Sequence, residues 1–264
     1  MYEEELAFAL ELAEEAGRIG LSFFRGSFDV REKVDRSPVT EADLAIEAML
    51  RREIRARYPE DAVLGEEGGL EGGSSRRWIV DPIDGTRNFA DRVQIWSTLI
   101  ALAVDEVPVL GVVELPALGE RYAAVRGGGA NLNGEPIRVS RADRLERAFV
   151  LYGEARDLID TPYGEAFLEL IRGARRERGF GDAWAHMLVA RGSADIMLEP
   201  ELSTWDWAAV SVVVEEAGGR ITTFEGEPLA HGASVLSTNG VLHDEVLARL
   251  AHARREAERR GAQA

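Results

Sequence analysis

Two aspartates three residues apart, Asp81 and Asp84, follow the short apolar run Trp78–Val80. The run predicts a buried strand that stops at Asp81, and Pro82 and Gly85 predict a polar turn behind it. Carboxylate oxygens and a backbone carbonyl in a tight turn are ligands that Mg²⁺ prefers, so this stretch is a candidate cation site. The alternative is that Asp81 only ends a strand and Asp84 only caps a helix.

A candidate anion site follows directly in the sequence. Gly85 and Thr86 stand behind Asp84, at the expected start of a short helix. Backbone N–H groups that face outward at such a start favour a phosphate. The sequence therefore predicts adjacent sites for a metal ion and a phosphate group.

Net charge restricts the partners of this chain. Its 264 residues include 31 Lys+Arg against 47 Asp+Glu, which gives a formal net charge of −16. This charge opposes contact with nucleic acid or anionic lipid, and an anionic substrate would need a bound metal. We therefore expect a small-molecule substrate, with no nucleic-acid and no membrane partner.

Composition narrows the chemistry further. The chain has no cysteine, which excludes disulfides, a thiolate nucleophile and Cys-ligated zinc or iron–sulfur clusters. A metal must then be held by oxygen or imidazole ligands. The acidic N-terminal residues, and the absence of any apolar stretch near the ~20 residues of a membrane span, predict a cytoplasmic protein.

Apolar periodicity predicts the elements that position these residues. Helices are expected over residues 2–24 and 40–58, whereas segments 25–39 and 65–75 are expected to be irregular. The strands expected to form an antiparallel meander are residues 96–104, 109–115 and 121–125. Beyond them, the patterns alternate between strand-like residues 148–152 and 194–198 and helix-like residues 162–175, 207–217 and 241–264. We expect an N-terminal α+β lobe, residues 1–140, with the metal and phosphate site, and a C-terminal α/β lobe, residues 141–264, in one continuous unit.

Three further motifs accompany Trp78–Thr86, namely Thr40–Asp43, Gly65–Gly69 and Trp205–Ala209. Together they resemble the inositol monophosphatase family, Mg²⁺-dependent and typically lithium-sensitive phosphomonoesterases, over nearly the whole chain. The combination W-I-V-D-P-I-D-G-T with W-D-x-A-A is highly specific. The resemblance implies a layered αβαβα sandwich, two or three Mg²⁺ ions with Mn²⁺ as a possible substitute, in-line attack by water on phosphorus, and a homodimer.

The resemblance also implies roles for individual residues. The metal ligands would be Glu66, Asp81 and the carbonyl of Ile83 for the first ion, Asp81, Asp84 and Asp206 for the second, and Glu66 through waters for a third. The groups that prepare the attacking water would be Thr86 and Asp43, and Lys33 lies where the family places an active-site lysine. Asp84, Gly85 and Thr86 would also contact the substrate.

Each of these roles has a structural alternative. Asp43 could only complete a capping box with Thr40. Glu66 could be one more loop acid, and Asp206 could cap a helix that begins at Trp207. A solvated side chain is the alternative for Lys33, the one lysine of the sequence.

The segment Arg178–Ala190 resembles the histidinol-phosphatase branch of the family. Asp182 stands where inositol-directed members usually have a small Ser or Thr, and a carboxylate suits a leaving group that carries an ammonium and an imidazole. The expected leaving-group contacts are Arg178, Gly181, Asp182, Ala183 and Glu199. Alternatively, Asp182 forms an ion pair with a nearby arginine such as Arg178, and His186 is a core histidine.

The function that this resemblance favours is hydrolysis of histidinol phosphate in histidine biosynthesis. Inositol 1-phosphate, or a broad range of sugar phosphates, is the alternative substrate. A more remote alternative is a non-catalytic binding protein of the same fold. The presence of all four metal carboxylates, Glu66, Asp81, Asp84 and Asp206, argues against it.

Overall fold

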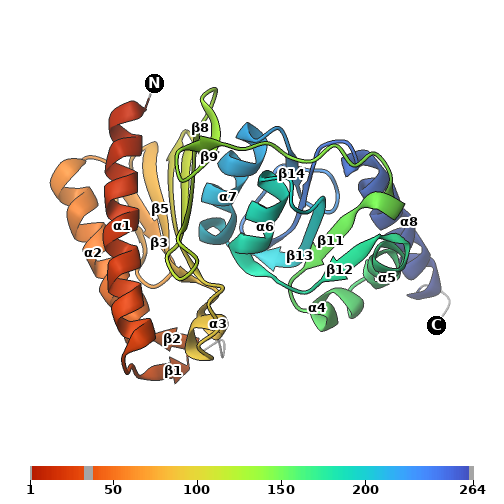
Figure 1. Ribbon diagram of the computed structural model, residues 1–264, viewed down its shortest axis with the longest axis horizontal. Coiled ribbons are helices and arrows are strands. Elements are labelled where there is room, and N and C mark those ends of the chain that lie inside the picture. The colour runs from red at the N-terminus through yellow and green to blue at the C-terminus, as the bar shows by residue number, and fades with distance from the viewer. Residues whose placement is uncertain (1, 33–37, 262–264) are drawn as a thin grey trace. The chain divides into compact units, whose positions relative to one another are not determined.

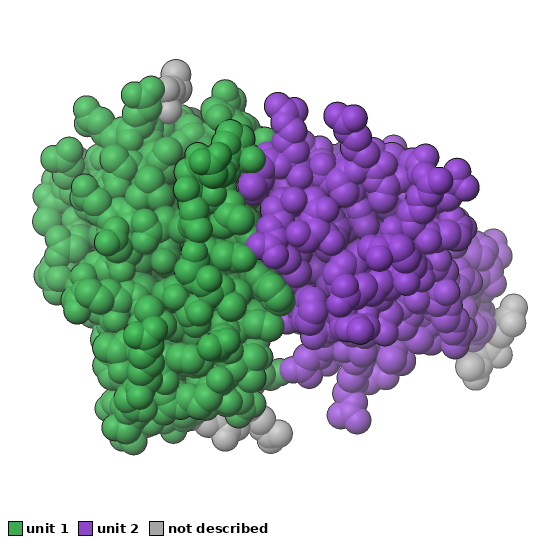
Figure 2. Space-filling model, in the orientation of Figure 1, with its two compact units in different colours: residues 1–136, 182–184, 205–216 green, residues 137–181, 185–204, 217–264 purple. Residues whose placement is uncertain are grey.

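The computed structural model describes residues 2–32 and 38–261. The chain divides into two compact units, each assembled from separate segments and shown in its own colour in Figure 2. Unit 1 comprises residues 1–136, 182–184 and 205–216, and unit 2 comprises residues 137–181, 185–204 and 217–264. Two short segments from the second half of the sequence thus cluster with the first half. A single boundary at residue 140 does not describe this exchange of segments. One of them carries Asp182 and the other Asp206.

Unit 1 is built on an eight-stranded mixed sheet of order β10-β9-β8-β7-β6-β5-β3-β4. Its strands are β3 (Ala62–Gly65), β4 (Gly69–Glu71), β5 (Arg76–Asp84), β6 (Ser97–Val104), β7 (Val107–Leu115), β8 (Glu120–Val125), β9 (Gly129–Leu132) and β10 (Glu135–Pro136). Strands β5 to β10 form an antiparallel meander, of which the apolar runs predicted β6, β7 and β8, and β3 pairs in parallel with β5.

Helices α1 (Glu3–Arg25) and α2 (Glu41–Arg57) lie side by side against this sheet (Figure 1). Helix α1 buries Ala9, Leu12, Ala13 and Ala16, a spacing that places all four on one face of the helix. These side chains join the buried residues of α2 and of the strands in one core cluster. The helical pair therefore covers one face of the sheet that carries Asp81 and Asp84.

The part of helix α7 (Thr204–Glu216) that belongs to unit 1 contacts β7 at a glycine. A Cβ atom on Gly111 would lie 2.3 Å from the carbonyl oxygen of Ala209. The neighbours Leu110 and Val112 belong to the core cluster under α1 and α2, so by strand alternation Gly111 faces the opposite side. Helix α7 thus rests backbone against backbone on the other face of the sheet, with Asp206 in its first turn.

Two segments expected to be irregular contain short strands. Strand β1 (Val30–Glu32) lies in segment 25–39 and pairs with β2 (Pro38–Thr40), which begins at the end of that segment. Strand β4 lies in segment 65–75 and pairs with β3, which ends at Gly65. For segment 65–75 the prediction was wrong because glycine there forms the turn of a hairpin, and Gly69, at φ 64°, begins the second strand. The hairpin of β3 and β4 carries Glu66 in its turn.

Unit 2 consists of helices packed on a five-stranded mixed sheet of order β12-β11-β13-β15-β14. Its strands are β11 (Phe149–Tyr152), β12 (Arg176–Arg178), β13 (Ile196–Leu202), β14 (Arg220–Thr222) and β15 (Ala233–Thr238). Its helical elements are η1 (Leu145–Arg147), α4 (Ala155–Ile159), α5 (Gly164–Gly173) and α8 (His243–Gly261), and α6 (Asp182–Ala190) begins in unit 1. Apolar side chains of α4, α5 and α8 share one core cluster with the sheet.

In the part of the chain that the structure describes, no helix is both long and apolar enough to cross a membrane.

Candidate metal centre

Strand β5 brings Asp81 and Asp84 to the same place. The sequence predicted that this strand stops at Asp81, but it runs on to Asp84. Its pairing with β6 shifts register between these two residues. In a regular strand, residues three apart face opposite sides of the sheet. A bulge re-aims the side chains next to it, which explains how both carboxylates serve one site.

The carboxylate of Asp206 completes a cluster with these two. One oxygen from each of Asp81, Asp84 and Asp206 lies within 4.8 Å of the others. Helix α7 begins at Thr204, so Asp206 is in its first turn and does not cap a helix that begins at Trp207. The alternative interpretation of Asp206 as that cap is therefore wrong.

Asp81 is the most buried carboxylate of this cluster, with 1% of its surface exposed. Burial raises its pKa well above the ordinary value, and the charges of Glu66, Asp84 and Asp206 add to this effect. Its Oδ1 atom is buried and has no hydrogen-bond partner among the residues that the structure describes. An unpartnered buried carboxylate oxygen is costly for a protein, and a cation is the partner that this one fits. The donors are all oxygens, which suits Mg²⁺.

Asp43 lies in the first turn of helix α2, and its side chain lies near Thr86, just behind Asp84 in the sequence. The capping box is present, because Asp43 Oδ2 accepts a hydrogen bond from the Thr40 backbone N–H at 2.8 Å. Asp43 Oδ1 lies 3.4 Å from the hydroxyl of Thr86, which in turn lies 2.8 Å from the carbonyl oxygen of Ile83. Burial raises the pKa of Asp43 to about 6, and the charge of Glu66 contributes. The same carboxylate thus caps a helix and contacts Thr86.

Glu66 is not one of the three clustered carboxylates. It lies close enough, however, for its charge to raise the pKa of both Asp81 and Asp43. The turn that carries it is held by Glu47 of α2, a buried carboxylate that accepts hydrogen bonds from the backbone N–H groups of Glu67 at 2.8 Å and Gly68 at 2.7 Å.

Glu47 was missed by the sequence analysis. It stands four residues after Asp43 and therefore on the same helical face, which was the available signal. Its carboxylate is partnered by Arg51 Nε at 2.8 Å. A Cβ on Gly65 would lie 2.6 Å from the Glu47 carboxyl carbon, so this glycine makes room for the contact.

The first residues of α6 contact Asp84. Asp84 Oδ2 accepts hydrogen bonds from Ser97 Oγ at 2.8 Å and from the Ala183 backbone N–H at 3.1 Å. The preceding residue, Asp182, accepts a hydrogen bond at 2.8 Å from the side-chain amide of Asn88, in α3 (Thr86–Ala90). Ser97 and Asn88 were not singled out from the sequence, although Asn88 stands two residues behind the D-G-T motif.

The other predicted leaving-group residues, Arg178, Gly181 and Glu199, belong to unit 2. Arg178 is exposed and donates to the carbonyl oxygen of Glu177 at 2.7 Å. Glu199 is buried, and one of its oxygens lies 3.0 Å from His186 Nε2. The other ring nitrogen of His186 lies 2.7 Å from Ser237 Oγ, so this is a buried histidine with both nitrogens partnered. Lys33 lies outside the described residues.

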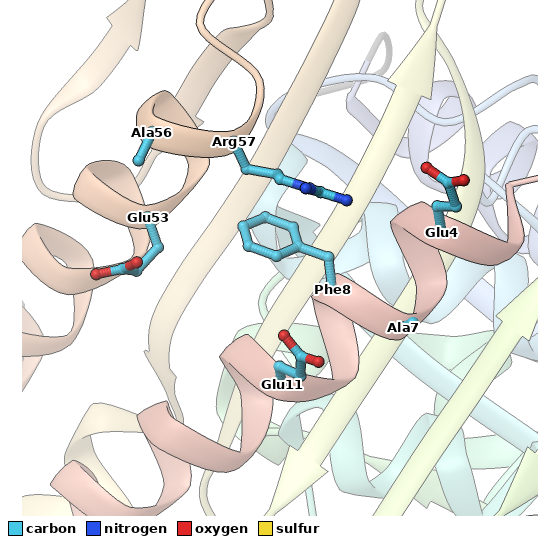
Figure 3. Close-up of a pocket in the computed structure, with 7 residues that line it drawn as sticks. All are labelled: Glu4, Ala7, Phe8, Glu11, Glu53, Ala56 and Arg57. Atoms are coloured by element: carbon cyan, nitrogen blue, oxygen red, sulfur yellow. The ribbon is translucent and has the colours of Figure 1, made fainter.

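A hollow of about 550 Å³ lies between α1 and α2, and none of the predicted site residues that the structure describes lines it. Figure 3 shows Arg57 of α2 reaching over the ring of Phe8 of α1, with Glu4 and Glu11 on the same helix as Phe8. The carboxylate cluster, and not this hollow, is the feature that marks a site.

Comparison with known proteins agrees with this geometry. The model of the inositol monophosphatase family matches residues 1–259. The histidinol-phosphatase of Chlorobaculum parvum is 41% identical over 255 residues, which cover 96% of this chain and 98% of that protein. The histidinol-phosphatase of Mycobacterium tuberculosis is 43% identical over 258 residues, which cover 95% of this chain and 99% of that protein.

Among solved structures, the IMPase of Thermotoga maritima has a TM-score of 0.87 at 32% identity, with 96% of this chain and 99% of that chain covered. The layered α/β sandwich predicted from the sequence, with mixed sheets flanked by helices, is therefore confirmed. Fold, motifs and relatives agree, and the chain belongs to the inositol monophosphatase family.

Proposed function

We propose that this chain is a Mg²⁺-dependent phosphomonoesterase that hydrolyses histidinol phosphate. The observation that carries the proposal is the convergence of Asp81, Asp84 and Asp206, where a buried oxygen of Asp81 has no hydrogen-bond partner within residues 2–32 and 38–261. Hydrolysis of phosphoric monoesters is the reaction of the family to which the chain belongs. Such a cluster in an acidic protein serves a dianionic substrate only when cations reverse the local charge.

The residues present fit two adjacent metal ions and a looser third. Glu66, Asp81 and the carbonyl of Ile83 would hold the first ion, and Asp81, Asp84 and Asp206 would hold the second. Glu66 would hold the third through waters. Mg²⁺ is the expected ion, and Mn²⁺ would substitute because it accepts the same oxygen ligands. When bound, the ions supply positive charge for the phosphate and lower the pKa of the attacking water.

The chain's own groups prepare the reaction. Thr86 and Asp43, whose side-chain oxygens lie 3.4 Å apart, orient the attacking water, and Asp43 accepts its proton. Gly85 and Thr86 present backbone N–H groups to the phosphate. Water oxygen bonds to phosphorus as the bond from phosphorus to the substrate's alcohol oxygen breaks, so no phosphoenzyme forms. Lys33 is part of this proposal by its place in the sequence alone.

Histidinol phosphate is favoured by the relatives and by Asp182. Proteins named histidinol-phosphatases share 41% and 43% identity with nearly the full chain. The Asp182 carboxylate stands next to the residue whose N–H contacts Asp84, and it suits an ammonium or imidazole. We propose that Arg178, Gly181, Ala183 and Glu199 also contact the leaving group.

Inositol 1-phosphate is the second candidate, because the chain is also similar to the IMPase of Thermotoga maritima. Homodimerisation follows from the family resemblance alone and belongs to the same proposal, as does the cytoplasmic location predicted from the sequence.

The test is phosphate release from histidinol phosphate and inositol 1-phosphate in parallel, with Mg²⁺, compared as kcat/KM. We expect histidinol phosphate to be preferred by about a hundredfold or more. Preference for inositol 1-phosphate would refute the substrate but not the reaction.

The control variants separate chemistry from folding. Asp84→Asn should nearly abolish turnover of both esters, whereas Asp105→Asn, in an exposed turn, should leave turnover unchanged. Full activity in EDTA, or in Asp84→Asn, would refute the metal-dependent mechanism.

A further inference from the structure

Helix α6 starts in an unusual backbone conformation. Gly181 has φ 68° and Asp182 has φ 53°. Positive φ is uncommon for residues with a side chain, and aspartate tolerates it best when its carboxylate finds a local hydrogen bond. Strained conformations of this kind persist where the surroundings hold them, and they occur often at functional sites.

Asn88 supplies the contact that holds Asp182. Its side-chain N–H₂ group donates to Asp182 Oδ2 at 2.8 Å. A Cβ on Gly85 would lie 3.1 Å from the same oxygen, so the absence of a side chain at Gly85 leaves room for the carboxylate. Asn88, Gly85 and Asp182 all belong to unit 1.

The conformation of Asp182 sets the direction of the next backbone N–H group. That group, on Ala183, donates to Asp84 Oδ2, which also accepts from Ser97 Oγ. Two donors on one oxygen fix the plane of the carboxylate and leave its orientation little freedom. Mutation of an outer partner that orients a ligand in this way weakens metal binding or activity.

We propose that Asn88 is a positioning residue for the metal centre. Through Asp182 it holds the Ala183 N–H group on Asp84, and so fixes the carboxylate that the proposed function assigns to a metal ion. The inference rests on that proposed metal site but not on the identity of the substrate. Loss of an outer partner weakens metal binding by about 10- to 100-fold, and the lower figure is expected here because Asn88 acts through another residue.

The first experiment compares Asn88→Ala with Asn131→Ala by calorimetric titration with Mg²⁺ alone. Asn131 is a matched control because its side-chain amide also donates to a partly buried oxygen in unit 1, the carbonyl of Ala123 at 3.1 Å. Asn88→Ala should bind Mg²⁺ about tenfold more weakly, and Asn131→Ala should match the wild type. Urea unfolding in EDTA checks that both variants fold. Wild-type Mg²⁺ affinity in folded Asn88→Ala would overturn the proposal.

A double-mutant cycle tests whether Asn88 acts through Asp182. Asp182→Ala should weaken Mg²⁺ binding as Asn88→Ala does, and the double variant should be no worse than either single variant. Asp182→Asn keeps an oxygen that accepts from Asn88, so it should retain wild-type Mg²⁺ affinity. Additive losses in the double variant, or a loss in Asp182→Asn equal to that in Asp182→Ala, would overturn the mechanism.

Activity adds a second readout. Asn88→Ala should lower kcat/KM on both histidinol phosphate and p-nitrophenyl phosphate, because Asp84 serves the phosphate that both esters share, and the loss should be larger on histidinol phosphate, whose leaving group Asp182 also contacts. A loss confined to histidinol phosphate would assign Asn88 to the leaving group and overturn the proposal. If the wild type binds Mg²⁺ but does not hydrolyse histidinol phosphate, the substrate proposal fails alone. If the wild type binds no Mg²⁺, both proposals fail.

Discussion

Asp43 is buried and carries a raised pKa, so its charge should destabilise the metal-free protein. Its pKa is about 6 in the folded chain, against an ordinary value of 3.8. The stability that this group contributes is present below the lower pKa and is lost as the pH rises through the higher one, because the folded state then holds a proton that the unfolded state has released. The difference of about 2.2 pH units corresponds to about 3 kcal/mol at neutral pH.

Substitution Asp43→Asn removes the charge and keeps an oxygen that can accept from Thr40. In EDTA, we expect the variant to unfold at higher urea concentration than the wild type at neutral pH, by up to about 3 kcal/mol in free energy of unfolding. The advantage should shrink by about 1.4 kcal/mol between about pH 8 and pH 5, and it should vanish near pH 3. The assay is urea unfolding of both proteins across this pH range.

Magnesium provides the internal control. Bound cations would offset the charge of the cluster, so saturating Mg²⁺ should reduce or reverse the advantage of Asp43→Asn, while the variant loses turnover. A difference in stability that stays constant with pH would refute the reasoning, because it would show that Asp43 does not change its protonation in this range. A wild type that is more stable at every pH would show instead that the helix cap needs the charge.

Three further outcomes are expected. Asp182→Asn should lower kcat/KM for histidinol phosphate about tenfold relative to p-nitrophenyl phosphate, because the substitution removes the negative charge and keeps the side chain in place. Equal losses on both esters would contradict this. Gly111→Ala should lower both the urea midpoint and Mg²⁺ affinity, because its Cβ would displace the helix that carries Asp206, whereas Gly73→Ala, with open space around its Cβ, should change neither. Burial lowers the pKa of His243 to about 4, so the stability that this neutral histidine contributes is present above its unfolded pKa of 6.5 and is lost as the pH falls towards 4. The expected loss is about 3 kcal/mol in the free energy of unfolding, and it should be absent when His243→Gln is unfolded in urea. An unchanged pH dependence in that variant would contradict the assignment to His243.

Local sequence signals were sufficient for the centre of the site. Asp81 and Asp84 could be found because a strand pattern and turn residues flank them, and Asp206 because its motif is specific. The structure brings these three carboxylates together, although nothing in their separation along the chain required it. The helices and the antiparallel meander followed from apolar periodicity, a property of neighbouring residues.

The supporting contacts could not be predicted, because each joins segments far apart in the sequence. Asn88 and Asp182 are 94 residues apart, and Glu47 binds backbone N–H groups about 20 residues away. An acid on a helix, such as Glu47, usually indicates a solvent-facing side. The short strands β1 to β4 were missed for a related reason, since three or four residues form a strand only when a partner strand is in place.

The exchange of segments between the two units has a consequence for the order of events during synthesis. Residues 1–136 can emerge and pair their strands while the segment that carries Asp206 is still unmade. Until residue 216 has left the ribosome, the sheet face at Gly111 lacks the helix that packs on it, and an apolar sheet surface in a partly made chain is prone to association. The metal centre is thus assembled last, by the same late segment that covers this face. A chain truncated after residue 136 would lack both the third carboxylate and that cover.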